Sequence, residues 1–255
     1  MQQSNTYIIV FTAILTVVLG GLLSLASVSL RPMQQKAVEI DTKKQILGAV
    51  VSLEGKTNDD ILKDYEAMIQ SKAVDFEGNE LEQDENGEPI IAENIDVAKM
   101  YKKDPKDRQY PVFLYHTEGN PEDIQAFILP VYGAGLWGPI WGFIALETDL
   151  ETIKGVVFDH ETETPGLGAR ITESGVQQRF KGKEIYDENG ELVSVAMLKG
   201  ENNPESRLGK HYVDGMSGAT ITADGVNDML KSYLKYYENY LKKVEEGSEK
   251  VALLD

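Results

Sequence analysis

The fold is decided by YPVFLYHT (Tyr110–Thr117), QAFILPVYG (Gln125–Gly133), PIWGFIALETD (Pro139–Asp149) and IKGVVFDHET (Ile153–Thr162), four stretches that follow one another along the chain. They are rich in aromatic and β-branched residues, and glycine, proline or acidic turns separate them. Such runs with such separators are typical of strands joined by short loops. They predict a twisted antiparallel sheet.

Helical patterns flank these strands. Between Asp224 and Val244, apolar residues recur at spacings of three and four, which indicates one amphipathic helix. Shorter helices are expected at Lys43–Val51, Asn58–Gln70 and around Glu173–Phe180. Asn58 or Asp59 is expected to cap the second of these. The predicted class is therefore α+β, with helices packed at the edges of the sheet.

Two polar stretches are interpreted as turns. Phe76–Pro89 is acidic and is expected to form an exposed hairpin or loop, and Tyr186–Leu198 a second hairpin. The pentapeptide DENGE occurs in both, at Asp84–Glu88 and Asp187–Glu191. Because Asn-Gly favours two-residue hairpin turns, the repeat is interpreted as shared turn chemistry and not as a shared site.

The N-terminal stretch from Thr6 to Leu30 is strongly apolar, and no ionisable side chain of an Asp, Glu, Lys, Arg or His precedes Arg31. About 20 apolar residues span a bilayer, so this stretch predicts one transmembrane helix, which Pro32 would end. A cleaved signal peptide is the alternative, but it usually has a basic start and a shorter apolar core. The expected domains are an anchor at 1–31, a helical and acidic part at 32–109, and a main domain at 110–255.

The charge pattern excludes some functions and complicates the membrane orientation. A formal net charge of −17 argues against nucleic-acid binding, because a chain this acidic repels the negatively charged phosphate backbone. The four cations after the apolar stretch, Arg31, Lys36, Lys43 and Lys44, would keep that side cytoplasmic under the positive-inside rule. The chain has no cysteine, and its three histidines are far apart without metal-ligand spacing. Redox chemistry would therefore need an organic cofactor or a partner's metal.

DGMSGATITADGV (Asp214–Val226) places small residues just ahead of the last helix. Thr220 or Thr222 could cap that helix. The small residues could instead admit a phosphate to the helix N-terminus, where free N–H groups and the helix dipole favour an anion. Thr220 could also carry a covalent group, since a partner enzyme can supply the activation. The spacing alone leaves all three interpretations open.

Two further glycine-rich loops accompany this one. Gly133–Asp149 has an aromatic residue at its tip, and His160–Ile171 places Leu167 between Gly166 and Gly168. Glycines permit positive φ, so Leu167 could project onto a planar ligand. Each loop alone is consistent with an ordinary turn. Together, three such loops suit a flat aromatic ring held by a phosphate.

The motif Asp-x-x-Ser-Gly-Ala-Thr, here Asp214–Thr220, resembles the flavinylation signature of FMN-binding domains, in which a flavin transferase joins FMN to the final threonine. GLWGPI (Gly135–Ile140), ETPGLGA (Glu163–Ala169) and DGMSGATIT (Asp214–Thr222) occur in the order found in the C-subunit family of the Na⁺-translocating NADH:quinone oxidoreductase. The N-terminal membrane helix is similar as well. The G subunit of Rnf-type ferredoxin:NAD⁺ oxidoreductases shares the motif and the anchor, and is the nearest alternative.

The resemblance implies roles for individual residues. Thr220 would carry FMN through a phosphoester bond, and Asp214, Ser217 and Thr220 would form the signal that the transferase reads. The expected cofactor contacts are Ser217, Gly218, Ala219, Ile221, Thr222, Glu163, Thr164, Leu167, Gly168, Leu136, Trp137 and Lys199. Lys199 could stabilise negative charge on the reduced flavin, although an ordinary surface lysine is an equal alternative.

The resemblance also implies a place in the cell and a reaction. The chain would be an electron-transfer subunit of the inner-membrane complex that couples NADH oxidation and ubiquinone reduction to Na⁺ export. Its partners would be the other membrane, flavin and iron–sulfur subunits. Flavinylation in this family occurs outside the cytoplasmic membrane, so the soluble domain is expected on the periplasmic side, against the charge bias. A membrane-anchored, non-redox assembly module is the alternative from another functional class.

Overall fold

The computed structural model describes residues 4–84 and 86–252. These residues form two compact units that divide between Lys43 and Lys44, and each unit is described by itself. The first consists of most of one helix. The second contains the sheet and the candidate site.

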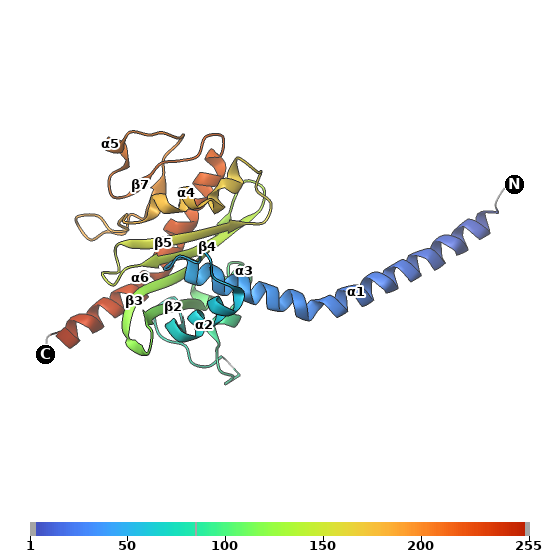
Figure 1. Ribbon diagram of the computed structural model, residues 1–255, viewed down its shortest axis with the longest axis horizontal. Coiled ribbons are helices and arrows are strands. Elements are labelled where there is room, and N and C mark those ends of the chain that lie inside the picture. The colour runs from blue at the N-terminus through green and yellow to red at the C-terminus, as the bar shows by residue number, and fades with distance from the viewer. Residues whose placement is uncertain (1–3, 85, 253–255) are drawn as a thin grey trace. The chain divides into compact units, whose positions relative to one another are not determined.

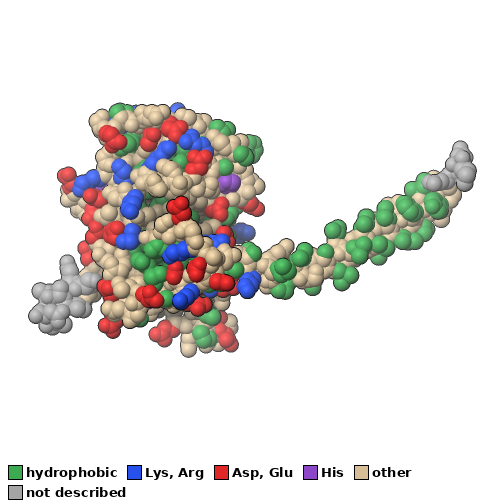
Figure 2. Space-filling view, in the orientation of Figure 1, with side chains coloured by type: hydrophobic (Ala, Val, Ile, Leu, Met, Phe, Trp, Pro, Cys, Tyr) green, Lys and Arg blue, Asp and Glu red, His purple; other side chains and the backbone are tan. Residues whose placement is uncertain are grey.

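The first unit lies within helix α1 (Asn5–Gly48), which is the one helix among the described residues long and apolar enough to cross a membrane by its length and composition. Figure 2 shows hydrophobic side chains along this helix, whereas charged side chains of both signs are dispersed over the second unit. At 1.5 Å per residue, α1 is about 66 Å long. The apolar stretch therefore continues directly into a polar helix.

The expectation that Pro32 ends the helix is wrong, because α1 continues through it to Gly48. A proline inside a helix removes one N–H donor, but a single missing hydrogen bond does not stop a helix when helix-favouring residues follow. Here Met33, Gln34 and Gln35 follow. The short helix expected at Lys43–Val51 is accordingly the last turns of α1, within the second unit from Lys44 onward.

Five antiparallel strands form the sheet of the second unit, in the order β1-β2-β3-β4-β5 (Figure 1). Their bounds are β1 Ile69–Val74, β2 Tyr110–Thr117, β3 Asn120–Ala134, β4 Pro139–Leu146 and β5 Ile153–His160. The antiparallel sheet predicted from the four β-rich stretches is confirmed. Strand β1 was not predicted, because the periodicity of the preceding helix was extended to Gln70, whereas α2 ends at Met68.

Each face of the sheet has its own apolar core because side chains alternate along a strand. Leu129 and Val131 of β3 lie in the core that includes the inner face of α6 (Thr220–Ala252). Ile128 lies in the opposite core, together with Ile46 at the end of α1 and residues of α2 (Asn58–Met68). The second unit is therefore a three-layer arrangement with helices on both faces of the sheet. The α+β class is confirmed, but the helices cover the faces of the sheet and not its edges as expected.

Short elements connect the strands and helices. Between β1 and β2 the chain forms η1 Ala92–Asn94, α3 Val97–Met100 and η2 Pro105–Asp107. After β5 it forms η3 Gly168–Thr172, α4 Ser174–Gln177, η4 Gln178–Phe180, β6 Ala196–Met197, α5 Glu205–Leu208 and β7 Tyr212–Val213. The helix expected around Glu173–Phe180 is present as α4 and η4. β6 and β7 form a small parallel pair.

The described residues of the two DENGE segments share the same hydrogen bonds. In each, the aspartate Oδ1 accepts the N–H groups two and four residues later, from Asn86 and Glu88 to Asp84, and from the matching residues to Asp187. Shared turn chemistry is therefore confirmed. The predicted two-residue hairpin is wrong, because only the glycine of each Asn-Gly pair has positive φ, whereas that turn needs it at both residues.

The cap of α2 differs from the expected one. Thr57, not Asn58 or Asp59, occupies the N-cap position. Its Oγ1 accepts the Asp60 N–H at 3.3 Å, while the Asp60 carboxylate accepts the Thr57 N–H at 3.0 Å. This reciprocal pair is a capping box, which satisfies two backbone donors at once.

Replacing Thr57 with alanine should therefore lower the free energy of unfolding by about 1 kcal/mol, because the cap loses its side-chain acceptor. Asn58→Ala is the matched control, since Asn58 lies one position inside the helix and is exposed. Urea unfolding of the detergent-solubilised protein, followed by far-UV circular dichroism, measures both variants. Equal losses for Thr57→Ala and Asn58→Ala would contradict the assigned cap.

Candidate functional site

The helix α6 begins at Thr220, four residues earlier than its apolar periodicity predicts. Its first helical hydrogen bond runs from the Ala223 N–H to the Ala219 carbonyl at 2.9 Å. Ala219 thus holds the cap position, and alanine has no side-chain acceptor. The interpretation of Thr220 or Thr222 as the cap is therefore wrong, because both lie inside the helix.

The first turn of α6 leaves backbone donors without protein partners. Among the described residues, no acceptor is found for the N–H groups of Thr220, Ile221 and Thr222. A helix N-terminus in this state presents free donors and the positive end of the helix dipole to an anion. Thr220 itself is half-buried, and Ser217 and Gly218 beside it are exposed. This geometry suits a phosphate at Thr220.

Glu163 joins the three glycine-rich loops. Its side chain is buried, with 4% of its surface exposed. Oε1 accepts the backbone N–H of Trp137 at 2.9 Å, and Oε2 accepts the hydroxyl of Thr222 at 2.7 Å. One carboxylate in the second loop is therefore bonded to the first loop and to the first turn of α6.

Glycines allow this close approach. A Cβ at Gly135 would overlap Oε1 of Glu163, and a Cβ at Gly168 would overlap both Oε2 and the Thr222 hydroxyl. Neither glycine has positive φ, so the requirement is space and not backbone conformation. Gly168, which was predicted to contact the cofactor, instead gives room to the Glu163 carboxylate.

Apolar side chains at the rim of the site are exposed. Trp137 and Ile221 are 66% and 58% exposed, and Leu136 and Leu167 are 46% and 42% exposed. Leu167 lies over Gly218, which has a φ of +76° and whose added Cβ would be 2.8 Å from the leucine Cδ2. The exposed apolar side chains suit the planar ring of FMN, and the free backbone donors suit its phosphate. The structure therefore brings together the residues predicted in these loops.

Thr164 and Lys199 lie at the margin of this arrangement. Thr164 has an exposed side chain, and its carbonyl accepts the N–H groups of Leu167 and Ala169 at 3.1 and 3.2 Å. Lys199 is exposed as well. A Cβ at Gly215 of the motif would overlap the carbonyl of Leu198, so the segment that carries Lys199 lies directly against the motif.

The carboxylate of Asp214 is bonded within the chain. It accepts the N–H of Asn202 at 2.8 Å, the N–H of Asn203 at 2.9 Å and the Asn203 side-chain amide at 2.9 Å. Burial raises the pKa of Asp214, but the hydrogen bonds from Asn203 and Asn202 outweigh it and lower the pKa overall. Asp214 thus holds the motif against the earlier segment 199–203.

An ionic cluster beside the motif was not predicted from the sequence. The Glu201 carboxylate accepts two hydrogen bonds from Arg170, at 2.7 and 3.1 Å, and one from Arg179 at 3.1 Å. These bonds, from Arg170 first and then Arg179, lower the pKa of Glu201 to about 2. Arg170 lies in η3 and Arg179 in η4, at separations of 31 and 22 residues from Glu201, so no local spacing could have indicated the cluster.

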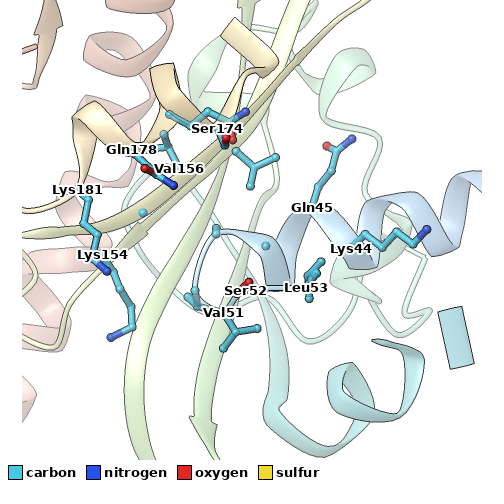
Figure 3. A pocket seen from close by; sticks show the side chains of 16 residues that line it. Lys44, Gln45, Val51, Ser52, Leu53, Lys154, Val156, Ser174, Gln178 and Lys181 are labelled. Atoms are coloured by element: carbon cyan, nitrogen blue, oxygen red, sulfur yellow. The ribbon is translucent and has the colours of Figure 1, made fainter. Parts of the chain in front are cut away.

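A separate groove of about 500 Å³ lies beside β5, away from these loops (Figure 3). Its wall includes Val51 and Leu53 after α1, Lys154 and Val156 of β5, and Lys181 after η4. None of the residues that line it is a predicted site residue. The candidate site is instead an open surface formed by three loops.

Because Glu163 accepts from the buried Thr222 hydroxyl and from the Trp137 N–H, Glu163→Ala should lower the free energy of unfolding by about 1–3 kcal/mol. Glu161→Ala, two residues away and exposed, should have little effect. Glu163→Gln should lie between them, since the Thr222 hydroxyl can turn to match the new amide. Thermal unfolding of the three variants gives the order. A Glu163→Ala variant as stable as Glu161→Ala would contradict this role.

The ionic cluster should depend on pH in one direction. The pKa of Glu201 falls from 4.5 to about 2 on folding, so its contribution is complete above pH 4.5 and is lost as the pH falls towards 2. The difference in melting temperature between the wild type and Glu201→Gln should therefore be constant from about pH 5 to 7 and shrink below that. Melting curves at intervals of one pH unit measure it. A difference that stays unchanged down to about pH 2 would rule out the ionic contribution.

Comparison with known proteins agrees with the geometry. Residues 135–235 match the model of the FMN-binding domain family, which confirms FMN as the expected cofactor. The C subunit of the Na⁺-translocating NADH-quinone reductase of Vibrio campbellii is 32% identical over 251 residues, covering 91% of this chain and 92% of its own. That of Pseudomonas aeruginosa is 30% identical with the same coverage.

Solved structures give the same result. The crystal structure of the C subunit of this reductase from Parabacteroides distasonis has a TM-score of 0.69 and 36% identity, and the match covers 83% of this chain and 96% of that one. Shewanella oneidensis NqrC has a TM-score of 0.66 at 24% identity, which supports the fold alone. These matches favour the C subunit over the Rnf-type alternative. The chain belongs to the C-subunit family of the Na⁺-translocating NADH-quinone reductase.

Proposed function

We propose that Thr220 carries FMN through a phosphoester bond. The observation that supports this most directly is the uncapped first turn of α6, where the hydroxyl of Thr220 stands beside three backbone donors for which the described residues offer no acceptor. A phosphate on this hydroxyl would supply the missing acceptors. An ordinary N-cap threonine accepts one of the first N–H groups of its helix with its own hydroxyl, whereas Thr220 lies inside α6.

The remaining residues of the site would hold the cofactor at its two ends. Ser217, Gly218 and Ala219 would border the phosphate, and the exposed side chains of Leu136, Trp137, Leu167 and Ile221 would contact the ring. Thr164 and Lys199 would face its polar edge. Glu163, Gly168 and Thr222 are bonded or packed together beneath this surface, so they would support the cofactor and not touch it.

Attachment would be a transfer reaction catalysed by a separate flavin transferase. The Thr220 hydroxyl oxygen forms a bond to the FMN phosphorus of a flavin dinucleotide, and the phosphoanhydride bond breaks. The nucleoside monophosphate leaves, and the threonine proton passes to a base of the transferase. Nothing is oxidised or reduced in this step. The chain offers no activating base next to Thr220 in the sequence, which suits a substrate of modification more than a nucleophile of its own.

The proposed role of the loaded protein is an electron relay in the sodium-translocating reductase. FMN supplies one-electron transfer, and the chain supplies position, shielding and surfaces for the other subunits. The apolar part of α1 provides a single-pass membrane anchor. We place the second unit on the periplasmic side of the inner membrane, because a flavin transferase of this kind acts there, although Arg31 and Lys36 favour the opposite orientation.

A non-redox assembly module is the competing class of function. In such a module, the small residues of the motif would only form the start of a helix. The exposed apolar rim argues against it, because large exposed apolar side chains concentrated around one loop cluster are typical of a binding site. The family model at residues 135–235 argues the same way.

Thr220→Ala should abolish covalent flavin when the full-length protein is co-expressed with a flavin transferase. The wild type should give a fluorescent band on a denaturing gel and an intact mass increased by one FMN ester, and the variant neither. Ser206→Ala is the control and should keep the added mass, because it removes an exposed hydroxyl of the same unit that lies in α5, outside the three loops. A wild-type protein without added mass would refute the proposal.

A further inference from the structure

The cluster of Glu201, Arg170 and Arg179 closes a ring with the motif. Arg179 donates to the carbonyls of Asp214 and Gly215, at 3.1 and 2.5 Å, as well as to Glu201. Asp214 in turn holds the segment that carries Glu201, through the bonds from Asn202 and Asn203. The contacts from Asp214 through Arg179 and Glu201 thus lead back to Asp214.

The ring reaches the loop just before the attachment residue. The N–H of Ser217 lies 3.5 Å from Oε2 of Glu201, at the limit of a hydrogen bond. Within the loop, the Ala219 N–H donates to the Met216 carbonyl at a long 3.3 Å. Neither bond alone would fix the loop. Its shape therefore depends on the charge-assisted bonds to Arg179, which hold two successive carbonyls at once.

Most of the acceptor capacity of the Asp214 carboxylate is already used within the chain. Three N–H groups already donate to its two oxygens, and Arg179 lies 4.0 Å from one of them. A transferase that read this carboxylate directly would have to use its one remaining acceptor position or break one of those bonds. A carboxylate used in this way positions a loop and does not present a contact.

We propose that Glu201, Arg170 and Arg179 form a buttress that holds residues 214–217 in the shape required for flavin attachment, and that Asp214 of the motif acts through this buttress and not by contacting the transferase. The inference rests on the proposed attachment at Thr220. It adds three positioning residues that lie outside the motif.

The test measures the initial rate of FMN incorporation into the full-length protein by a purified flavin transferase, as a function of protein concentration. Glu201→Gln removes the charge that Arg170 and Arg179 share, and should lower kcat/KM about tenfold. Arg179→Lys keeps a positive charge but lacks the fork that reaches two carbonyls and Glu201 together, and should have a similar effect.

Glu173→Gln is the matched control. Glu173 also pairs with Arg170, at 3.4 Å, but it is exposed and, within the part of the chain that the structure describes, makes no hydrogen bond or ion pair with residues 214–217. Its incorporation rate should equal that of the wild type. Thermal unfolding of each variant shows that the second unit is folded, and should Glu201→Gln fail to fold, Arg179→Lys and Asp214→Asn decide the question.

A double-mutant cycle separates the two roles of Asp214. If Asp214 and Glu201 act through one network, Asp214→Asn combined with Glu201→Gln should be no slower than the slower single variant. If Asp214 contacts the transferase, the two losses should multiply, and Asp214→Asn should be slow while Glu201→Gln and Arg179→Lys match the wild type. That second pattern overturns the buttress.

The failure of the proposed function would look different. In that case the wild type would take up no FMN, and every variant would equal it. The visible circular dichroism of the attached flavin gives a further readout, since a displaced loop alters the ring's surroundings even after complete incorporation. A wild-type spectrum in fully loaded Glu201→Gln and Arg179→Lys, together with unchanged rates, would also overturn the inference.

Discussion

The geometry of the site depends on one buried carboxylate, that of Glu163. It lies on the second loop and bonds to the backbone of the first, at Trp137, and to the first turn of α6, at Thr222. A buried acceptor must be satisfied or it costs stability, so each of these contacts constrains the others. Strands fix the positions of two loops, and Glu163 fixes the gap between them and the helix. The exposed apolar side chains of these loops are therefore held around the first turn of α6 and remain exposed.

Much of the fold follows from patterns that a sequence displays directly. The runs from Tyr110 onward are aromatic and β-branched, and they became strands β2 to β5 because such residues suit a sheet covered on both faces. The three motif loops were also predictable, and so was their convergence at one place. Strand β1 was not, because the predicted helix was extended over its first two residues to Gln70, and only the pairing of residues 69–74 with β2 makes them a strand.

The parts of the site that could not be predicted are those made by long-range pairing. Glu163 was expected to contact a flavin, yet its partners lie 26 and 59 residues away, and nothing local indicates a hydroxyl or a backbone donor at that distance. The ionic cluster around Glu201 is of the same kind. Two local predictions also failed for local reasons. Helix-favouring residues follow Pro32 and continue α1, and the capping box of Thr57 and Asp60 moves the cap of α2 one residue before the expected position.

The missing cap of α6 has a thermodynamic consequence. A helix that starts at Ala219 without a side-chain acceptor begins less stably than one that starts at serine or aspartate. Any anion that binds the three free donors binds the folded form and not the unfolded chain, and so shifts the folding equilibrium towards the native state. If Thr220 carries the proposed phosphate, maturation and stability would be linked in α6. The unmodified chain would be the form that proteases remove most readily, and the loaded chain the one that persists.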